Sequence, residues 1–185
     1  WPKLWKHHGA KEQAARINPA VRLDGVAGGA FCPTDGFIRP LAILQGYVEA
    51  ARRLGVRFEW GTEVTGFERQ GRRIVAIRTP NGALAADKVV NAAGAWAAPL
   101  ARLAGVELPV TPLRRQVAAT VPCDLLPASM PMTIWAGDGF HLRVRDGRVL
   151  LLWPTPGVPG RPYDASLDPE WVRAVVDKAS GRVPV

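Results

Sequence analysis

The chain has 185 residues, of which 48% are hydrophobic, and this is enough for one or two small domains with a core. It contains no apolar run of the ~18 residues that a membrane span needs and no apolar secretory signal at its start. The formal charge is +8, but the arginines are scattered in ones and twos without interleaved aromatics. This pattern argues against a nucleic-acid partner and favours carboxylates or phosphates of small ligands.

In chain order, a short helix over residues 13–22, broken at Asn18-Pro19, and a strand at residues 30–32 are expected first. A turn over residues 33–36 follows. The clearest element is an amphipathic helix over residues 40–54. Pro40 suits the first helical position, apolar residues recur at helical spacing, and Gly55 is placed to cap the end.

Alternating apolar and charged residues then predict a strand over residues 56–60. Two further strands are expected at residues 64–69 and 73–79, and Asn81-Gly82 is a strong hairpin-turn dipeptide. This pattern of a helix followed by strands indicates a mixed α/β class.

Residues 88–96 combine a short run that favours a buried strand with four small residues and a tryptophan. Val89 and Val90 favour a pleated backbone, and Ala92 to Ala95 remove side-chain bulk. A backbone with such small side chains permits either close packing of a strand against a helix or contact with a large flat ligand. The residues alone favour the packing interpretation.

The remainder reads as a second, antiparallel region. A short helix is expected over residues 97–104, and prolines over residues 109–112 suggest a crossing between domains. Strands are expected at residues 114–121, 132–135, 139–145 and 148–153, and a final helix is expected to begin at Pro169 with Asp168 as its cap.

Several chemical motifs are absent from the sequence. There is no GxGxxG, P-loop, GxSxG or HExxH motif, and no histidine lies at metal-ligand spacing from Cys32 or Cys123. No metal site is therefore predicted. The two cysteines favour buried free thiols in a reducing compartment, with a disulfide as the alternative, and they predict a cytoplasmic location. His7-His8 suits a solvated or tag-like terminus better than a ligand site.

Two further features carry possible chemistry. Residues 35–40 lie at the N-terminal end of the long helix, and a turn followed by a helix start is enough to explain their sequence. His141 and Arg143 lie two residues apart on a predicted strand and so share one face. A solvated sheet face is the simpler interpretation of that pair, and a polar ligand site is the other.

The ordered set of motifs resembles the D-amino-acid oxidase superfamily, which includes glycine oxidase, sarcosine oxidase and dehydrogenases of D-amino acids and N-methylated glycines. The resemblance spans roughly residues 25–185. Its motifs are Gly29 to Phe31, Asp35 to Pro40, Thr62 to Val64, Thr79 to Gly82, Val89 to Trp96, Leu108 to Val110, Arg115-Gln116 and Asp138 to Phe140.

The resemblance implies a central fragment of a longer protein, a reading that the start at Trp1 also favours. Residues 33–108 would be the central part of a Rossmann-like FAD-binding domain that lacks its GxGxxG strand. Residues 1–32 and 109–185 would belong to an antiparallel-sheet substrate domain.

The resemblance also implies site residues by position. The backbone of Val64 would contact the adenine of FAD, Ala93 and Gly94 would pass near its phosphates and ribityl chain, and Trp96 would lie nearby. His141 and Arg143 would be on the substrate side. Relatives often have tyrosine at the position of His141, so this departure puts the usual amino-acid substrate in doubt.

The implied reaction is oxidation of the carbon–nitrogen bond of a small amine or amino acid to an imine, by hydride transfer to the flavin. The resemblance implies no catalytic residue in this chain, since the carboxylate-binding arginine lies elsewhere in such enzymes. Two alternatives remain open at this point, a flavin domain of a tRNA-modifying enzyme and a non-catalytic binding module.

Overall fold

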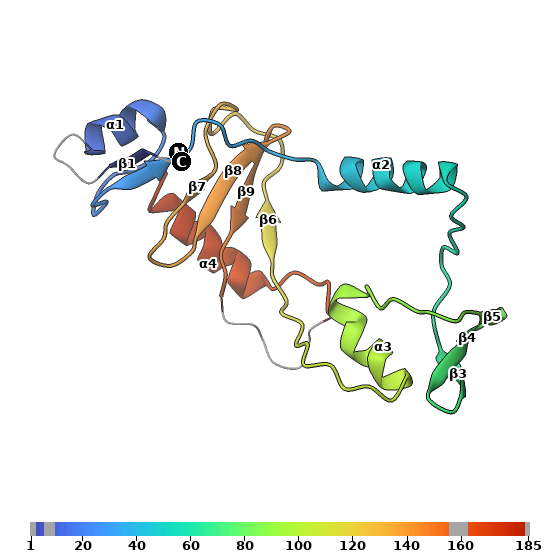
Figure 1. The fold of residues 1–185 in the computed structure, drawn as a ribbon. Helices are drawn as coiled ribbons and strands as arrows, with labels where there is room; N and C mark the ends of the chain where they lie inside the picture. The colour runs from blue at the N-terminus through green and yellow to red at the C-terminus, as the bar shows by residue number, and fades with distance from the viewer. Residues whose placement is uncertain (1–2, 6–9, 156–162, 184–185) are drawn as a thin grey trace. The chain divides into compact units, whose positions relative to one another are not determined.

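The computed structural model describes residues 3–5, 10–155 and 163–183 (Figure 1). Its helices are α1 (Ala10–Ile17), α2 (Pro40–Arg53), η1 (Gly94–Trp96), α3 (Ala97–Leu103) and α4 (Pro169–Ser180). Its strands are β1 (Lys3–Trp5), β2 (Gly29–Phe31), β3 (Gly66–Gln70), β4 (Arg73–Thr79), β5 (Gly82–Ala85), β6 (Val117–Ala119), β7 (Thr133–Ile134), β8 (His141–Arg145) and β9 (Arg148–Leu152). The predicted mixture of helices and antiparallel sheet is confirmed.

The chain divides into two compact units. Unit 1 comprises residues 1–35 and 114–185, and unit 2 comprises residues 36–113. Unit 1 is therefore built from both ends of the chain, and unit 2 is inserted between them in sequence.

Unit 1 contains a four-stranded antiparallel sheet in the order β6-β9-β8-β7. Helix α4 packs on the sheet (Figure 1), and together they enclose a hydrophobic core. Phe140, Leu142 and Val175 are fully buried there. Helix α4 begins as its sequence predicts, because the Asp168 side chain accepts a hydrogen bond from the backbone N–H of Glu170.

Unit 2 contains α2, the three-stranded meander β3-β4-β5, η1 and α3. Phe67 and Ala76 are its buried strand residues, and α3 contributes Ala98 and Ala101. A hairpin forms where it was predicted, but its two turn residues are Pro80 and Asn81, one position earlier than expected, because Thr79 pairs directly with Gly82 of β5. Gly55 ends the long helix with a φ of +84° and donates its N–H to the carbonyl of Arg52, as expected for a glycine cap.

Two predicted strands do not form. Residues 56–60 have no strand partner among the described residues, and the rings of Phe58 and Trp60 stack on each other instead, with centroids 5.3 Å apart. Residues 88–91 likewise form no strand and have no strand partner among the described residues, and Val90 is 89% exposed rather than buried. Side-chain pattern favours an extended backbone at both places, but a strand also requires a neighbour for its hydrogen bonds.

Smaller differences concern the ends of elements and the cysteines. The first helix is α1, which begins three residues before its predicted start and ends before Asn18, and β2 lies one residue earlier than expected. Cys32 and Cys123 are both free thiols, but they are half-buried rather than buried. His7-His8 lies outside the described residues. Within the described ranges no helix has the length and apolarity to cross a membrane.

Candidate functional site

Strand β8 presents two different faces. Leu142 and Val144 are buried in the core beneath α4, whereas His141, Arg143 and Arg145 alternate with them and are half-buried. This alternation follows from the period of two in a pleated strand. His141 and Arg143 therefore lie on the same face of β8, as predicted, and this face is opposite to the core.

The strand register shows which residues surround His141. It is directly opposite Ile134 of β7 and Leu152 of β9, and Leu152 in turn is opposite Val117 of β6. Directly opposite residues of antiparallel strands point to the same side of the sheet. His141 therefore lies in a row of aliphatic side chains, and Ile134 is 59% exposed in that row.

The next row contains Arg143, which is opposite Leu150 of β9, and Leu150 is opposite Ala119 of β6. We call these two rows the open face, made of Val117, Ala119, Ile134, His141, Arg143, Leu150 and Leu152. The Cα atoms of His141 and Arg143 are about 7 Å apart along the strand. An apolar surface with an imidazole and a guanidinium side by side suits a small ligand with both an amine and a carboxylate.

The turn before β8 is held by a cluster of charges at Asp138. This carboxylate accepts hydrogen bonds from Lys178 Nζ at 2.6 Å and from two nitrogens of Arg182 at 2.7 and 3.1 Å. It also accepts the backbone N–H of Phe140 at 3.1 Å. The Arg182 guanidinium lies 4.9 Å from the centroid of the Trp135 ring. The cluster thus joins the 137–139 turn to the end of α4.

Opposing effects act on the pKa of Asp138. Its burial raises the pKa, because an ionised carboxylate loses hydration, but the hydrogen bonds from Arg182, Lys178 and Phe140 and the charge of Arg182 lower it more. The net result is a pKa far below the ordinary value of 3.8. Asp138 is therefore an ionised structural group and not a proton donor at neutral pH.

Asp138→Asn is expected to lower the free energy of unfolding at pH 7 by about 2 kcal/mol, since it removes charge-assisted hydrogen bonds. Because the folded pKa lies below the unfolded one, the wild-type contribution is present above about pH 3.8 and is lost as the pH falls toward the folded pKa. The free energy of unfolding of the variant should therefore fall less on acidification than that of the wild-type protein. Urea unfolding at several pH values measures both effects.

Asp146→Asn is the matched control, at the next hairpin turn of the same sheet. The Asp146 side chain is 58% exposed and lies 3.5 Å from Arg145 Nε. Its loss should cost less than about 0.5 kcal/mol at neutral pH. Equal losses in the two variants would contradict the role assigned to the Asp138 cluster.

In unit 2, the stretch at residues 91–96 forms a bare turn. The Asn91 side chain accepts the N–H of Ala93 at 3.2 Å and donates to the carbonyl of Ala97 at 2.9 Å, which holds the turn against the start of α3. Gly94 has a φ of +55°, and a Cβ added to it would meet nothing within 4 Å. Trp96 is 59% exposed beside it. This open, side-chain-poor backbone fits contact with a large flat cofactor.

This turn contains three of the predicted cofactor residues. Gly94 and Trp96 lie in η1, and Ala93 immediately precedes it. Val64 belongs to a different segment of unit 2. It is half-buried and precedes β3, which begins its pairing with β4 at Gly66. No described contact joins Val64 to the turn at residues 91–96.

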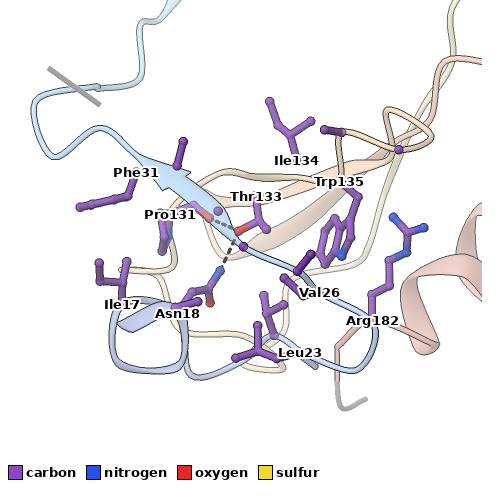
Figure 2. A pocket seen from close by; sticks show the side chains of 18 of the residues that line it. Ile17, Asn18, Leu23, Val26, Phe31, Pro131, Thr133, Ile134, Trp135 and Arg182 are labelled. Carbon is purple, nitrogen blue, oxygen red and sulfur yellow. Dashed lines mark hydrogen bonds between the residues drawn. The ribbon is translucent and has the colours of Figure 1, made fainter. Parts of the chain in front are cut away.

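A cavity of about 750 Å³ in unit 1 was not predicted from the sequence (Figure 2). It lies between the 17–31 segment and the 131–138 segment, and Arg182 also lines it. Asn18 Nδ2 donates to Thr133 Oγ1 at 2.7 Å, whereas the buried Asn18 Oδ1 has no partner among the described residues. The charged lining residues Asp138 and Arg182 bond to each other, so the cavity offers mainly apolar surface.

Sequence reasoning missed both this cavity and the Asp138 cluster. The small residues at 27–30 were a signal for close approach of backbone, but they did not indicate which segment they would face. The sequence marked Asp138 only as part of the motif from Asp138 to Phe140, because its partners Lys178 and Arg182 are 40 and 44 positions away.

Comparison with known proteins gives a consistent result. A family model described as FAD dependent oxidoreductase matches residues 6–185. The chain is 36% identical over 143 residues to hydrogen cyanide synthase subunit HcnC of Pseudomonas aeruginosa, covering 76% of this chain and 33% of the relative. It is 29% identical over 140 residues to mitochondrial dimethylglycine dehydrogenase of Rattus norvegicus, covering 74% of this chain and 16% of the relative.

Among solved structures, L-proline dehydrogenase from P. horikoshii is similar over 99% of this chain and 48% of its own length. The TM-score is 0.86 and the identity is 26%. The chain therefore spans less than half the length of each of these three proteins.

Proposed function

Because the chain belongs to the family of FAD-dependent oxidoreductases, we propose that the protein containing it oxidises the carbon–nitrogen bond of a small amine or amino acid to an imine. The observation that carries this proposal is the family match over residues 6–185. Two of the three relatives named above are a dimethylglycine dehydrogenase and an L-proline dehydrogenase, which favours an amine substrate over tRNA.

The open face supports the proposal from the side of the substrate. Arg143 places a guanidinium on the substrate side, where it attracts a substrate carboxylate in addition to the carboxylate-binding arginine that lies elsewhere in such enzymes, and His141 faces the substrate nitrogen. The aliphatic neighbours Ile134, Leu150 and Leu152 bind the carbon skeleton and exclude water from it. A substrate without a carboxylate would use the same apolar rows and lose only the contact with Arg143.

Unit 2 contributes to the binding of FAD in this proposal. The backbone of Ala93 and Gly94 approaches the phosphates and ribityl chain, Trp96 packs nearby, and the Val64 backbone contacts the adenine. When bound, the flavin accepts the hydride that leaves the substrate carbon. The residues of this chain bind and orient the two reactants.

The domain assignment and the setting are part of the same proposal. Residues 33–108 form the central part of a Rossmann-like FAD-binding domain, and residues 1–32 and 109–185 form part of the substrate domain. The two free thiols support a reducing, cytoplasmic location, which fractionation of cells producing the protein would test.

The complete protein is expected to be yellow when purified, with flavin absorbance that bleaches anaerobically on adding glycine, dimethylglycine or L-proline. Ala93→Leu should weaken FAD binding by about tenfold or more, because added bulk would hold the cofactor away from the backbone. Titration of the apoprotein with FAD measures the affinity.

The control is Ala92→Leu, which adds the same bulk at the neighbouring exposed position. It should leave the affinity within about twofold. A colourless protein that binds no FAD would overturn the proposed function, and equal weakening by the two variants would remove Ala93 from the cofactor site.

A further inference from the structure

The hydrogen bond of His141 determines which ring nitrogen carries the proton. Nδ1 lies 2.8 Å from the carbonyl oxygen of Gly139. A carbonyl oxygen only accepts hydrogen bonds, so Nδ1 must be the protonated nitrogen in this contact. In a neutral imidazole the other nitrogen then has a lone pair, so Nε2 of His141 is a hydrogen-bond acceptor.

The carbonyl that imposes this tautomer is held in place from two sides. The backbone N–H of Phe140, which follows Gly139, donates to the Asp138 carboxylate, and Lys178 and Arg182 anchor that carboxylate to α4. On the other side, Pro154 lies so close to Gly139 that an added Cβ would be 2.6 Å from its Cγ. The turn is therefore rigid, and His141 keeps one tautomer and one ring orientation.

The described surroundings of Nε2 provide no partner for it. The cross-strand neighbours of His141 are the aliphatic Ile134 and Leu152. The charged groups on the same face of β8 are the cations Arg143 and Arg145, and β7 and β9 add no carboxylate beside the ring. An acceptor in such half-buried, aliphatic surroundings favours a ligand that brings an N–H donor.

Resting on the proposed function, we propose that Nε2 of His141 accepts a proton from the ammonium group of the substrate. One N–H bond of the ammonium breaks, its electron pair stays on the substrate nitrogen, and the proton bonds to the lone pair of Nε2. The resulting imidazolium keeps its Nδ1–H bond to the Gly139 carbonyl. The freed lone pair of the amine is the one that imine formation requires.

Two substitutions separate hydrogen bonding from proton transfer in the complete protein. His141→Gln places an amide oxygen near the position of Nε2, which can accept a hydrogen bond but cannot take up the proton. His141→Asn can still donate to the Gly139 carbonyl but does not reach that position. Both are expected to lower kcat about 100-fold or more, with KM changed less in His141→Gln than in His141→Asn.

Arg145→Gln is the matched control, since Arg145 lies on the same face of β8 beyond Arg143. It should leave kcat within about twofold, because it is not part of the proposed substrate contact. Bound flavin, measured by absorbance, checks that every variant still carries the cofactor.

Nitrogen NMR of the protein labelled with ¹⁵N-histidine gives a readout that does not depend on activity. The signal that disappears in His141→Asn should show a protonated Nδ1 and an unprotonated Nε2. A protonated Nε2 in the neutral ring would overturn the proposal, as would flavin-loaded His141 variants with unchanged kcat. Absence of flavin from the wild-type protein would instead overturn the proposed function, and the NMR result would still test the tautomer.

Discussion

Leu142→Ala is expected to lower the free energy of unfolding of unit 1 by about 3–4 kcal/mol. Leu142 is 0% exposed and lies at the centre of the core, between Thr133 and Leu151 in the strand register. Truncation removes its buried methyl groups and leaves a cavity that two flanking strands and α4 prevent from closing. Guanidinium chloride unfolding followed by tryptophan fluorescence measures the loss.

Leu125→Ala makes the same chemical change at an exposed position of the same unit. The Leu125 residue is 54% exposed, so its truncation should cost less than about 0.5 kcal/mol. If Leu142→Ala were as mild as this control, the core would not be organised around β8.

Gly139→Ala is expected to cost about 3 kcal/mol, from left-handed backbone strain of about 1–2 kcal/mol and an added steric clash. Gly139 has a φ of +70°, and its added Cβ would lie 2.6 Å from Pro154 Cγ and 3.3 Å from Pro154 Cδ. The proline ring is stiff, so the turn or the following strand must shift. Thermal unfolding of the variant measures the cost.

Gly147→Ala separates the two contributions. Gly147 has a φ of +68° in the next hairpin turn, but an added Cβ there meets nothing within 4 Å. Only the strain remains, so a loss of about 1 kcal/mol is expected. A double variant that combines Gly139→Ala with Pro154→Ala should recover part of the stability that Gly139→Ala loses. No difference between the two glycine variants would show that Pro154 does not constrain the turn.

The same contact connects stability to the proposed chemistry. The Gly139 carbonyl that a shifted turn would displace is the group that orients His141. Gly139→Ala is therefore expected to lower activity more than Gly147→Ala, even at temperatures where both variants are folded. This follows because only the first turn holds the imidazole.

Local signals in the sequence predicted most elements within a few residues. Pro40 and Gly55 mark the ends of α2, Asn81-Gly82 marks the β4–β5 hairpin, and Asp168 marks the start of α4. These signals succeed because a cap or a tight turn depends on a few neighbouring residues. The pairing of His141 with Arg143 on one face was predictable for the same reason, since it needs only the alternation of a strand.

Predictions failed where the outcome depends on a distant partner. Val89 and Val90 favour an extended backbone, yet none of the described residues supplies a strand to pair with them. Phe58 and Trp60 alternate like strand residues but stack in a loop. The ion cluster at Asp138 was invisible for a related reason, because only the packing of α4 on the sheet brings Lys178 and Arg182 to it.

The sequence by itself determined the family resemblance, the class of fold, and the small-residue turn at residues 91–96, since these depend on residue order and local backbone preference. Only the tertiary structure decided that His141 lies between Ile134 and Leu152 and that its Nδ1 faces the Gly139 carbonyl. Strand register and turn geometry set those neighbours, and both arise from contacts between segments that are separate in the chain.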